Sequence, residues 1–169
     1  MDGADTLLTT AEVAVALAGF SGVVVVLGRP SLSDWTPVDV LRLQVLLGVS
    51  LGAVILALLP LAFHHVGLTH ALVIGLSSSL MGGYILIAGV LFQRSIRGLS
   101  PESRQSVSGG LTGVLSAIWL LVFVVIVLNA IGIVFQHEFG VYFFSLLWFL
   151  VVAAVQFARI MLVRFRVRE

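Results

Sequence analysis

The sequence predicts an all-α integral membrane protein, a bundle of five transmembrane helices with its N-terminus outside and its C-terminus in the cytoplasm. Three observations predict this class. Of the 169 residues, 60% are hydrophobic and only 10% are charged. The apolar residues fall into five runs, each close to the ~20 residues that cross about 30 Å of hydrocarbon. The basic residues all fall on one side of the membrane that these runs define.

The composition excludes an ordinary water-soluble fold. The mean hydropathy is +1.18, and a soluble domain of this size would leave most of these apolar side chains on its surface. The chain has no cysteine, which excludes disulfides, thiolate metal sites and cysteine nucleophiles. A lipid bilayer is therefore the first partner that the sequence predicts.

The five expected spans form one transmembrane domain, residues 1–169, and cover residues 8–28, 40–63, 71–92, 111–135 and 141–163. The second helix has a clear start, because Thr36 can cap it, Pro37 suits the first helical position and Asp39 suits the first turn. Within it, Pro60 frees the carbonyl of Leu56, which lies four residues earlier.

The later spans follow the same logic. Ser100, Pro101 and Glu102 repeat the start signal, so we expect the fourth helix to begin near Pro101 with two polar turns before its span. The connections at residues 64–70 and 136–140 are short, and they predict antiparallel helix hairpins.

The arginines set the expected orientation. All nine basic residues are arginines, and five spans place every one of them on the same side: Arg29, Arg42, Arg94, Arg97, Arg104, Arg159, Arg164, Arg166 and Arg168. The ionisable residues on the other side are acidic residues and histidines, with no Lys or Arg. The positive-inside rule therefore makes it the outer side. The all-arginine basic set and the Ala/Val/Gly-rich composition indicate a multi-pass protein of a bacterial inner membrane.

Three polar residues are candidates for an ion pathway: Glu12, Ser21 and Asn129. Glu12 is an acidic residue inside an apolar run, and intramembrane carboxylates are costly enough to indicate function. An alternative is a capping box, in which Glu12 reaches back to the backbone of Thr9 at an interfacial helix start. The two roles are compatible.

The histidines form a second candidate site. The expected outer loops bring together imidazole and carboxylate groups that could bind zinc or copper: His64, His65, His70, His137 and Glu138. Their spacing matches no metal motif, and they could equally be solvated interfacial residues or titrate between pH 5 and 8.

The C-terminal arginines predict anchoring to anionic lipids of the inner leaflet, at about 1 kcal/mol per residue near the surface. The residues concerned are Arg159, Arg164, Arg166 and Arg168. We expect no nucleic-acid partner. Small residues four apart, such as Gly48 and Gly52, allow close helix approach, either within one chain or between copies.

Three functions remain open. The first is a homo-oligomeric channel or pore that passes ions, with polar and small residues of the first helix near the pathway. The second is a small transporter or sensor that binds a cation or metal at the outer histidines. The third is a structural or accessory subunit of a membrane complex. The sequence has no P-loop, HExxH, GxSxG or paired-carboxylate motif, so we expect neither an enzyme nor a cofactor.

Overall fold

The chain folds into a helical bundle. The computed structural model describes residues 3–28, 35–107 and 109–166, which are 88% helical and contain no strand. These residues form α1 (Ala4–Gly28), α2 (Pro37–His65), α3 (His70–Arg97), α4 (Pro101–Val107), α5 (Gly110–Ile131) and α6 (Phe139–Arg166). Five of these helices, all except α4, are long and apolar enough to span a membrane. The predicted class and number of spans are confirmed.

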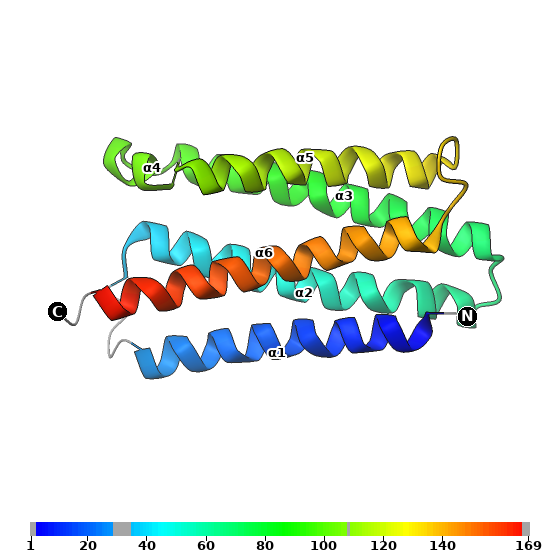
Figure 1. The fold of residues 1–169 in the computed structure, drawn as a ribbon, viewed down its shortest axis with the longest axis horizontal. Helices are drawn as coiled ribbons and strands as arrows, with labels where there is room; N and C mark the ends of the chain where they lie inside the picture. The colour runs from blue at the N-terminus through cyan, green and yellow to red at the C-terminus, as the bar shows by residue number, and fades with distance from the viewer. Residues whose placement is uncertain (1–2, 29–34, 108, 167–169) are drawn as a thin grey trace.

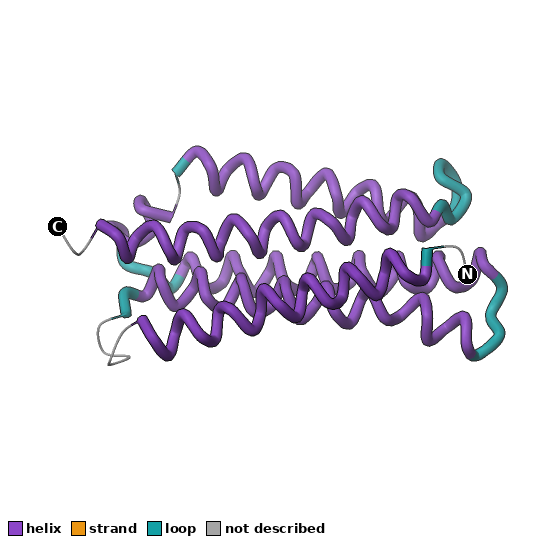
Figure 2. Tube along the Cα trace, turned by 60° about the horizontal axis from the view of Figure 1, so that its bottom comes forward, coloured by secondary structure: helices purple, strands orange, loops and turns teal. Residues whose placement is uncertain are grey.

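The long helices lie side by side along one axis (Figures 1 and 2). α2 and α6 pack against each other in the middle of the bundle, and α1 covers them on one side. On the other side α3 and α5 form a pair, with α3 against α2 and α5 against α6. We call the end of the bundle that holds α4 the arginine end, and the end that holds residues 64–70 and 132–138 the histidine end.

The start of α2 agrees with the sequence prediction. The Thr36 hydroxyl accepts a hydrogen bond from the Asp39 N–H at 3.2 Å, and the Asp39 carboxylate accepts one from the Thr36 N–H at 3.3 Å. Pro37 occupies the first turn, where its missing N–H leaves no helical bond unmade. This capping box fixes where α2 begins, at the arginine end of the bundle.

The fourth predicted helix is not continuous. Its polar start forms the separate helix α4, and α5 begins only at Gly110, with Gly109 as its N-cap residue. Glycine is a poor helix former, so the Gly109–Gly110 pair divides the two helices. At its other end α5 stops at Ile131 instead of residue 135, because Gly132 adopts a left-handed conformation with φ of 74°.

The first helix also begins earlier than expected, at Ala4 instead of residue 8. Gly3 precedes it with φ of 92°, and a Cβ there would lie 2.6 Å from the ring of Phe139 in α6. Glycine is therefore the residue that lets the start of α1 dock under α6. Because Thr9 and Glu12 lie inside the helix, the predicted capping box between them is wrong.

Two tyrosines hold the interior by donating hydrogen bonds to backbone carbonyls of α2. Tyr142 of α6 donates to the carbonyl of Leu56. This is the carbonyl that Pro60 leaves without its helical N–H donor, so the tyrosine satisfies a backbone group that would otherwise be orphaned in an apolar environment.

The second tyrosine depends on a glycine. Tyr84 of α3 donates to the carbonyl of Gly48, and a Cβ on Gly52 would lie 2.5 Å from the Tyr84 ring. The two small residues Gly48 and Gly52 therefore serve packing within the chain. The rings of Tyr84 and Trp119 both contact Phe149 of α6, at centroid distances of 5.6 and 5.0 Å. These contacts join α3 and α5 to the middle of the bundle.

Candidate functional site

The outer face of α1 carries polar residues that the rest of the bundle does not cover. Along α1 the side chains that face α2 and α6 recur every three or four residues, and they include Leu7, Ala11 and Ala14, all buried. The opposite face of the helix is exposed: Asp5, Thr9, Glu12, Ala16, Gly19 and Val23. We call this set the α1 outer face. Its members lie on one side because they too are spaced by three or four residues.

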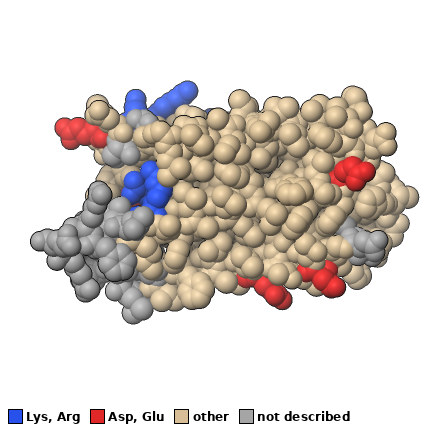
Figure 3. Space-filling model, in the orientation of Figure 1, with Lys and Arg blue, Asp and Glu red and all other residues tan. Residues whose placement is uncertain are grey.

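Glu12 lies well inside the span on this face. It is eight residues beyond Ala4, the first residue of α1, which is about 12 Å along the axis at roughly 1.5 Å per residue. The side chain is exposed, and the described part of the chain gives it neither a hydrogen bond nor an ion pair. Figure 3 shows acidic side chains along the edge of the bundle that α1 forms. A carboxylate therefore points out of the bundle at a depth where lipid would surround it.

Ser21 does not share this face. It follows Glu12 by nine residues, which at about 100° per residue places it on the opposite side of the helix. Its side chain is buried, and its hydroxyl donates to the Ala18 carbonyl of its own helix at 2.6 Å. Glu12 and Ser21 of one chain therefore do not line a single path, contrary to the sequence expectation.

Asn129 lies away from both of them, at the histidine end. Its amide nitrogen donates to the Ser78 hydroxyl at 3.1 Å and to the Glu138 carbonyl at 3.2 Å, and its oxygen accepts from the Glu138 N–H at 2.9 Å. The side chain is completely buried. Asn129 therefore ties α3, the end of α5 and the start of α6 together, which is a structural role in the isolated chain.

The histidines do not gather into a metal site. Across residues 3–28, 35–107 and 109–166, no group of three or more His, Asp and Glu side chains could hold a metal ion. His64, His65 and His70 are exposed near the α2–α3 turn, where His65 bonds the Leu61 carbonyl of its own helix at 2.8 Å. Glu138 is also exposed, at the start of α6.

His137 behaves differently from the other histidines. Its backbone is left-handed, with φ of 62°, and its ring fills the space above Gly75, where a Cβ would lie 3.2 Å from it. The ring nitrogen Nδ1 is buried without a hydrogen-bond partner. His137 therefore wedges the α5–α6 connection against α3, and the five predicted metal ligands remain dispersed.

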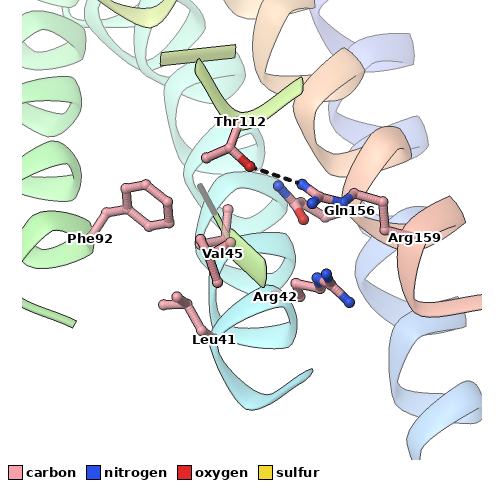
Figure 4. A pocket seen from close by; sticks show the side chains of 8 residues that line it. Leu41, Arg42, Val45, Phe92, Thr112, Gln156 and Arg159 are labelled. Atoms are coloured by element: carbon pink, nitrogen blue, oxygen red, sulfur yellow. Dashed lines mark hydrogen bonds between the residues drawn. The ribbon is translucent and has the colours of Figure 1, made fainter. Parts of the chain in front are cut away.

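A cleft at the arginine end brings together polar residues from three helices (Figure 4). Arg159 of α6 reaches toward α5, where its guanidinium donates to the Thr112 hydroxyl at 3.4 Å. Gln156 lies beside it on α6, and Arg42 projects from α2. The remaining wall is apolar and consists of Leu41, Val45, Phe92 and Val107. We call this the arginine cleft.

The arginine cleft changes the prediction for the C-terminal arginines. Arg159 points into the bundle instead of forming part of an exposed basic tail. Figure 3 shows that the basic side chains on this face of the molecule lie near the same end. Arg168 lies outside the described residues, as do the side chains of Arg164 and Arg166 in the last turn of α6, so the structure places only the first of these four arginines.

Sequence reasoning missed Arg42, Thr112 and Gln156 as members of one site. One signal was present, because Gln156 and Arg159 are polar residues three apart in an apolar helix and must share a face. Their partners on α2 and α5 depend on how the helices pack, which the spacing does not determine. No protein-family model, curated protein or solved structure matches the chain.

Proposed function

We propose that the chain forms a homo-oligomeric pore for cations, in which the α1 outer faces of several copies surround the pathway. The observation that carries this proposal is the exposed Glu12 on a helix long and apolar enough to span a membrane. A carboxylate facing lipid at such a depth is unfavourable by ~2.5–3.5 kcal/mol or more on insertion scales. Contact with water in a pore removes most of that cost.

The neighbours of Glu12 support the same arrangement. Ala16 and Gly19 follow it along the α1 outer face, and a Cβ on Gly19 would meet no atom within 4 Å. Small residues at this spacing let helices from different chains approach closely in lipid. The face therefore suits contact with another helix better than contact with lipid tails.

Charge favours cations as the permeant species. In a ring of identical chains each Glu12 would stand at the same depth, and rings of acidic side chains select cations in known channels. Asp5 lies two turns before Glu12 on the same face and is exposed, so it would form a second acidic ring at the mouth. The described residues of α1 include no basic residue to oppose this field.

The proposal includes an orientation of the protein in the membrane. The described arginines lie at the end of the bundle that holds α4, which supports a cytoplasmic arginine end and an N-terminus outside. We place the protein in a bacterial inner membrane, with the C-terminal arginines facing anionic lipids. The α1 outer face would then open to the extracytoplasmic side.

Conductance in a planar bilayer tests the proposal. The purified protein is reconstituted under a KCl gradient, and the reversal potential is compared among wild type, Glu12→Gln and Glu102→Gln. Glu102 is the matched control, because it is an exposed carboxylate on α4 at the arginine end. We expect a cation-selective reversal potential that Glu12→Gln moves toward zero and Glu102→Gln leaves in place.

Two results would contradict the proposal. One is wild-type conductance no higher than that of protein-free bilayers. The other is a Glu12→Gln channel with the selectivity of wild type. Absent conductance together with a stable complex containing a different protein would favour the accessory-subunit function instead.

A further inference from the structure

The arginine cleft has more positive charge than the surrounding residues neutralise. Arg42 pairs with Asp39 at 3.7 Å, but Asp39 also accepts hydrogen bonds from the backbone and the hydroxyl of Thr36. Arg159 has no carboxylate partner within the described ranges, and its hydrogen bond to the Thr112 hydroxyl is long, at 3.4 Å. Among the described residues, only one of the two guanidinium groups therefore has a carboxylate partner, and that carboxylate is also engaged by Thr36.

The two arginines line the same cleft. Both carry a positive charge, and both side chains are partly withdrawn from solvent. Such an arrangement is unfavourable unless an anion sits between or beside the guanidinium groups. Guanidinium donors are arranged in a planar fork that matches the oxygen atoms of phosphate and carboxylate groups.

Gln156 supplies a second, independent feature. Its side chain is 92% buried, being 8% exposed, and its amide oxygen has no hydrogen-bond donor. A buried acceptor without a donor costs free energy, so a ligand that brings a hydroxyl or another donor to this position is favoured. Gln156 lines the same cleft as the two arginines.

The shape and position of the cleft limit the class of ligand that it can bind. The cleft encloses little space of its own and is open at its mouth, so it suits a small polar headgroup whose remainder stays outside better than a whole metabolite. Arg42 and Thr112 lie within the first two turns of α2 and α5, close to the depth of lipid headgroups. Phe92, Val45 and Leu41 supply an apolar wall beside the charges.

We infer that the arginine cleft is a binding site for a phosphate ester that carries hydroxyl groups, with Arg42 and Arg159 holding the phosphate and Gln156 accepting from a hydroxyl. Thr112 orients Arg159 toward the cleft. The same chemistry is offered by an anionic phospholipid with a glycerol headgroup and by free glycerol phosphate. This site is independent of the α1 outer face, which lies on the far side of α1 from α2 and α6.

Native mass spectrometry of the full chain in mild detergent tests the inference. Phosphatidylglycerol and phosphatidylcholine are titrated against wild type, Arg159→Gln, Gln156→Leu and Arg94→Gln. Arg94 is the matched control, because it is an exposed arginine at the same end of the bundle and does not line the cleft. Thermal unfolding without lipid establishes that each variant is folded, and Arg159→Lys replaces Arg159→Gln if the latter does not fold.

We expect wild type and Arg94→Gln to bind phosphatidylglycerol alike and in preference to phosphatidylcholine. Loss of a charge-assisted hydrogen bond in Arg159→Gln should weaken that binding about tenfold or more. Gln156→Leu should weaken it about threefold, as for a neutral hydrogen bond. The affinity of Arg159→Lys for phosphatidylglycerol should lie between those of wild type and Arg159→Gln, because lysine keeps the charge but lacks the planar guanidinium fork.

A competition with glycerol phosphate identifies the source of the phosphate. If millimolar glycerol phosphate displaces the lipid, and this displacement depends on Arg159, the site belongs to a free phosphate ester. If the lipid stays bound at that concentration, the site belongs to a membrane lipid. Either result supports a phosphate site in the cleft. Equal binding of both lipids, or equal loss of phosphatidylglycerol in Arg94→Gln and Arg159→Gln, would overturn the inference.

Discussion

The interior of the bundle and the outer face of α1 both carry polar residues in an apolar chain, but only the interior supplies them with partners. Asn129 makes one hydrogen bond to α3 and two to the Glu138 backbone before α6, and Tyr84 and Tyr142 each satisfy a carbonyl of α2. Glu12 has no partner among the described residues. This difference indicates that the interior polar groups stabilise the fold, whereas Glu12 interacts with a group outside the chain.

The interior includes exceptions that sharpen the contrast. Buried polar atoms without a partner among the described residues are the Ser50 and Ser77 hydroxyls, His137 Nδ1, Trp148 Nε1 and the Gln156 amide oxygen in the arginine cleft. An unpartnered neutral hydroxyl is far less costly than an unpartnered carboxylate, so Ser50 and Ser77 need no external contact. The contrast therefore depends on charge as well as on hydrogen bonding.

The largest effect on stability is expected at Asn129. Asn129→Leu removes three hydrogen bonds, one to α3 and two to the α5–α6 connection, and leaves the Glu138 N–H with the Phe135 carbonyl as its acceptor. Hydrogen bonds in membrane proteins average ~0.6 kcal/mol and reach ~1.7, so the unfolding free energy should fall by about 2–3 kcal/mol. Unfolding in a detergent titration, followed by circular dichroism, measures it. Ser145→Ala is the control, because Ser145 bonds only its own helix, and it should change little.

Tyr142→Phe should have the next largest effect. It leaves the carbonyl of Leu56 without a donor, at a cost of about 1 kcal/mol. Pro60→Ala restores a backbone N–H that can bond this carbonyl, so the cost of Tyr142→Phe should shrink in that background. A double-mutant cycle on the same titration tests this, and purely additive effects would show that Tyr142 does not substitute for the missing N–H.

A smaller change in stability should distinguish Gly52, in the interior, from Gly19, on the α1 outer face. Gly52→Ala places a methyl group 2.5 Å from the Tyr84 ring and should destabilise the chain by about 1 kcal/mol. Gly19→Ala meets no atom within 4 Å and should leave the isolated chain as stable or slightly more stable, because alanine favours helix. Gly19→Ala should instead weaken association between chains. Equal destabilisation by both variants would remove the distinction between the two faces.

The sequence was sufficient for the membrane class, the five spans and the start of α2, because hydropathy and capping act locally. Thr36, Pro37 and Asp39 form the predicted capping box. The helix ends were harder, since Gly109 and Gly132 break α4 from α5 and end α5 through backbone conformation, not hydropathy.

The candidate sites were less accessible to sequence reasoning. Glu12 could be singled out, but its position within α1 depends on where the helix starts, and Ser21 then falls on the opposite face. The arginine cleft depends on the packing of α2, α5 and α6, so Arg42 and Gln156 could not be joined to Arg159 from spacing alone. The periodic pattern of apolar residues does not determine which helices distant in the chain contact one another.

Cross-linking through a single introduced cysteine tests most directly whether the α1 outer face meets another copy. The chain has no cysteine of its own, so Ala16→Cys and the control Leu121→Cys, on the exposed side of α5, each carry one thiol. Oxidation in the bilayer should join Ala16→Cys chains of 18.1 kDa into covalent dimers and leave Leu121→Cys monomeric. Monomers of Ala16→Cys, or dimers of both variants in equal amount, would contradict the account.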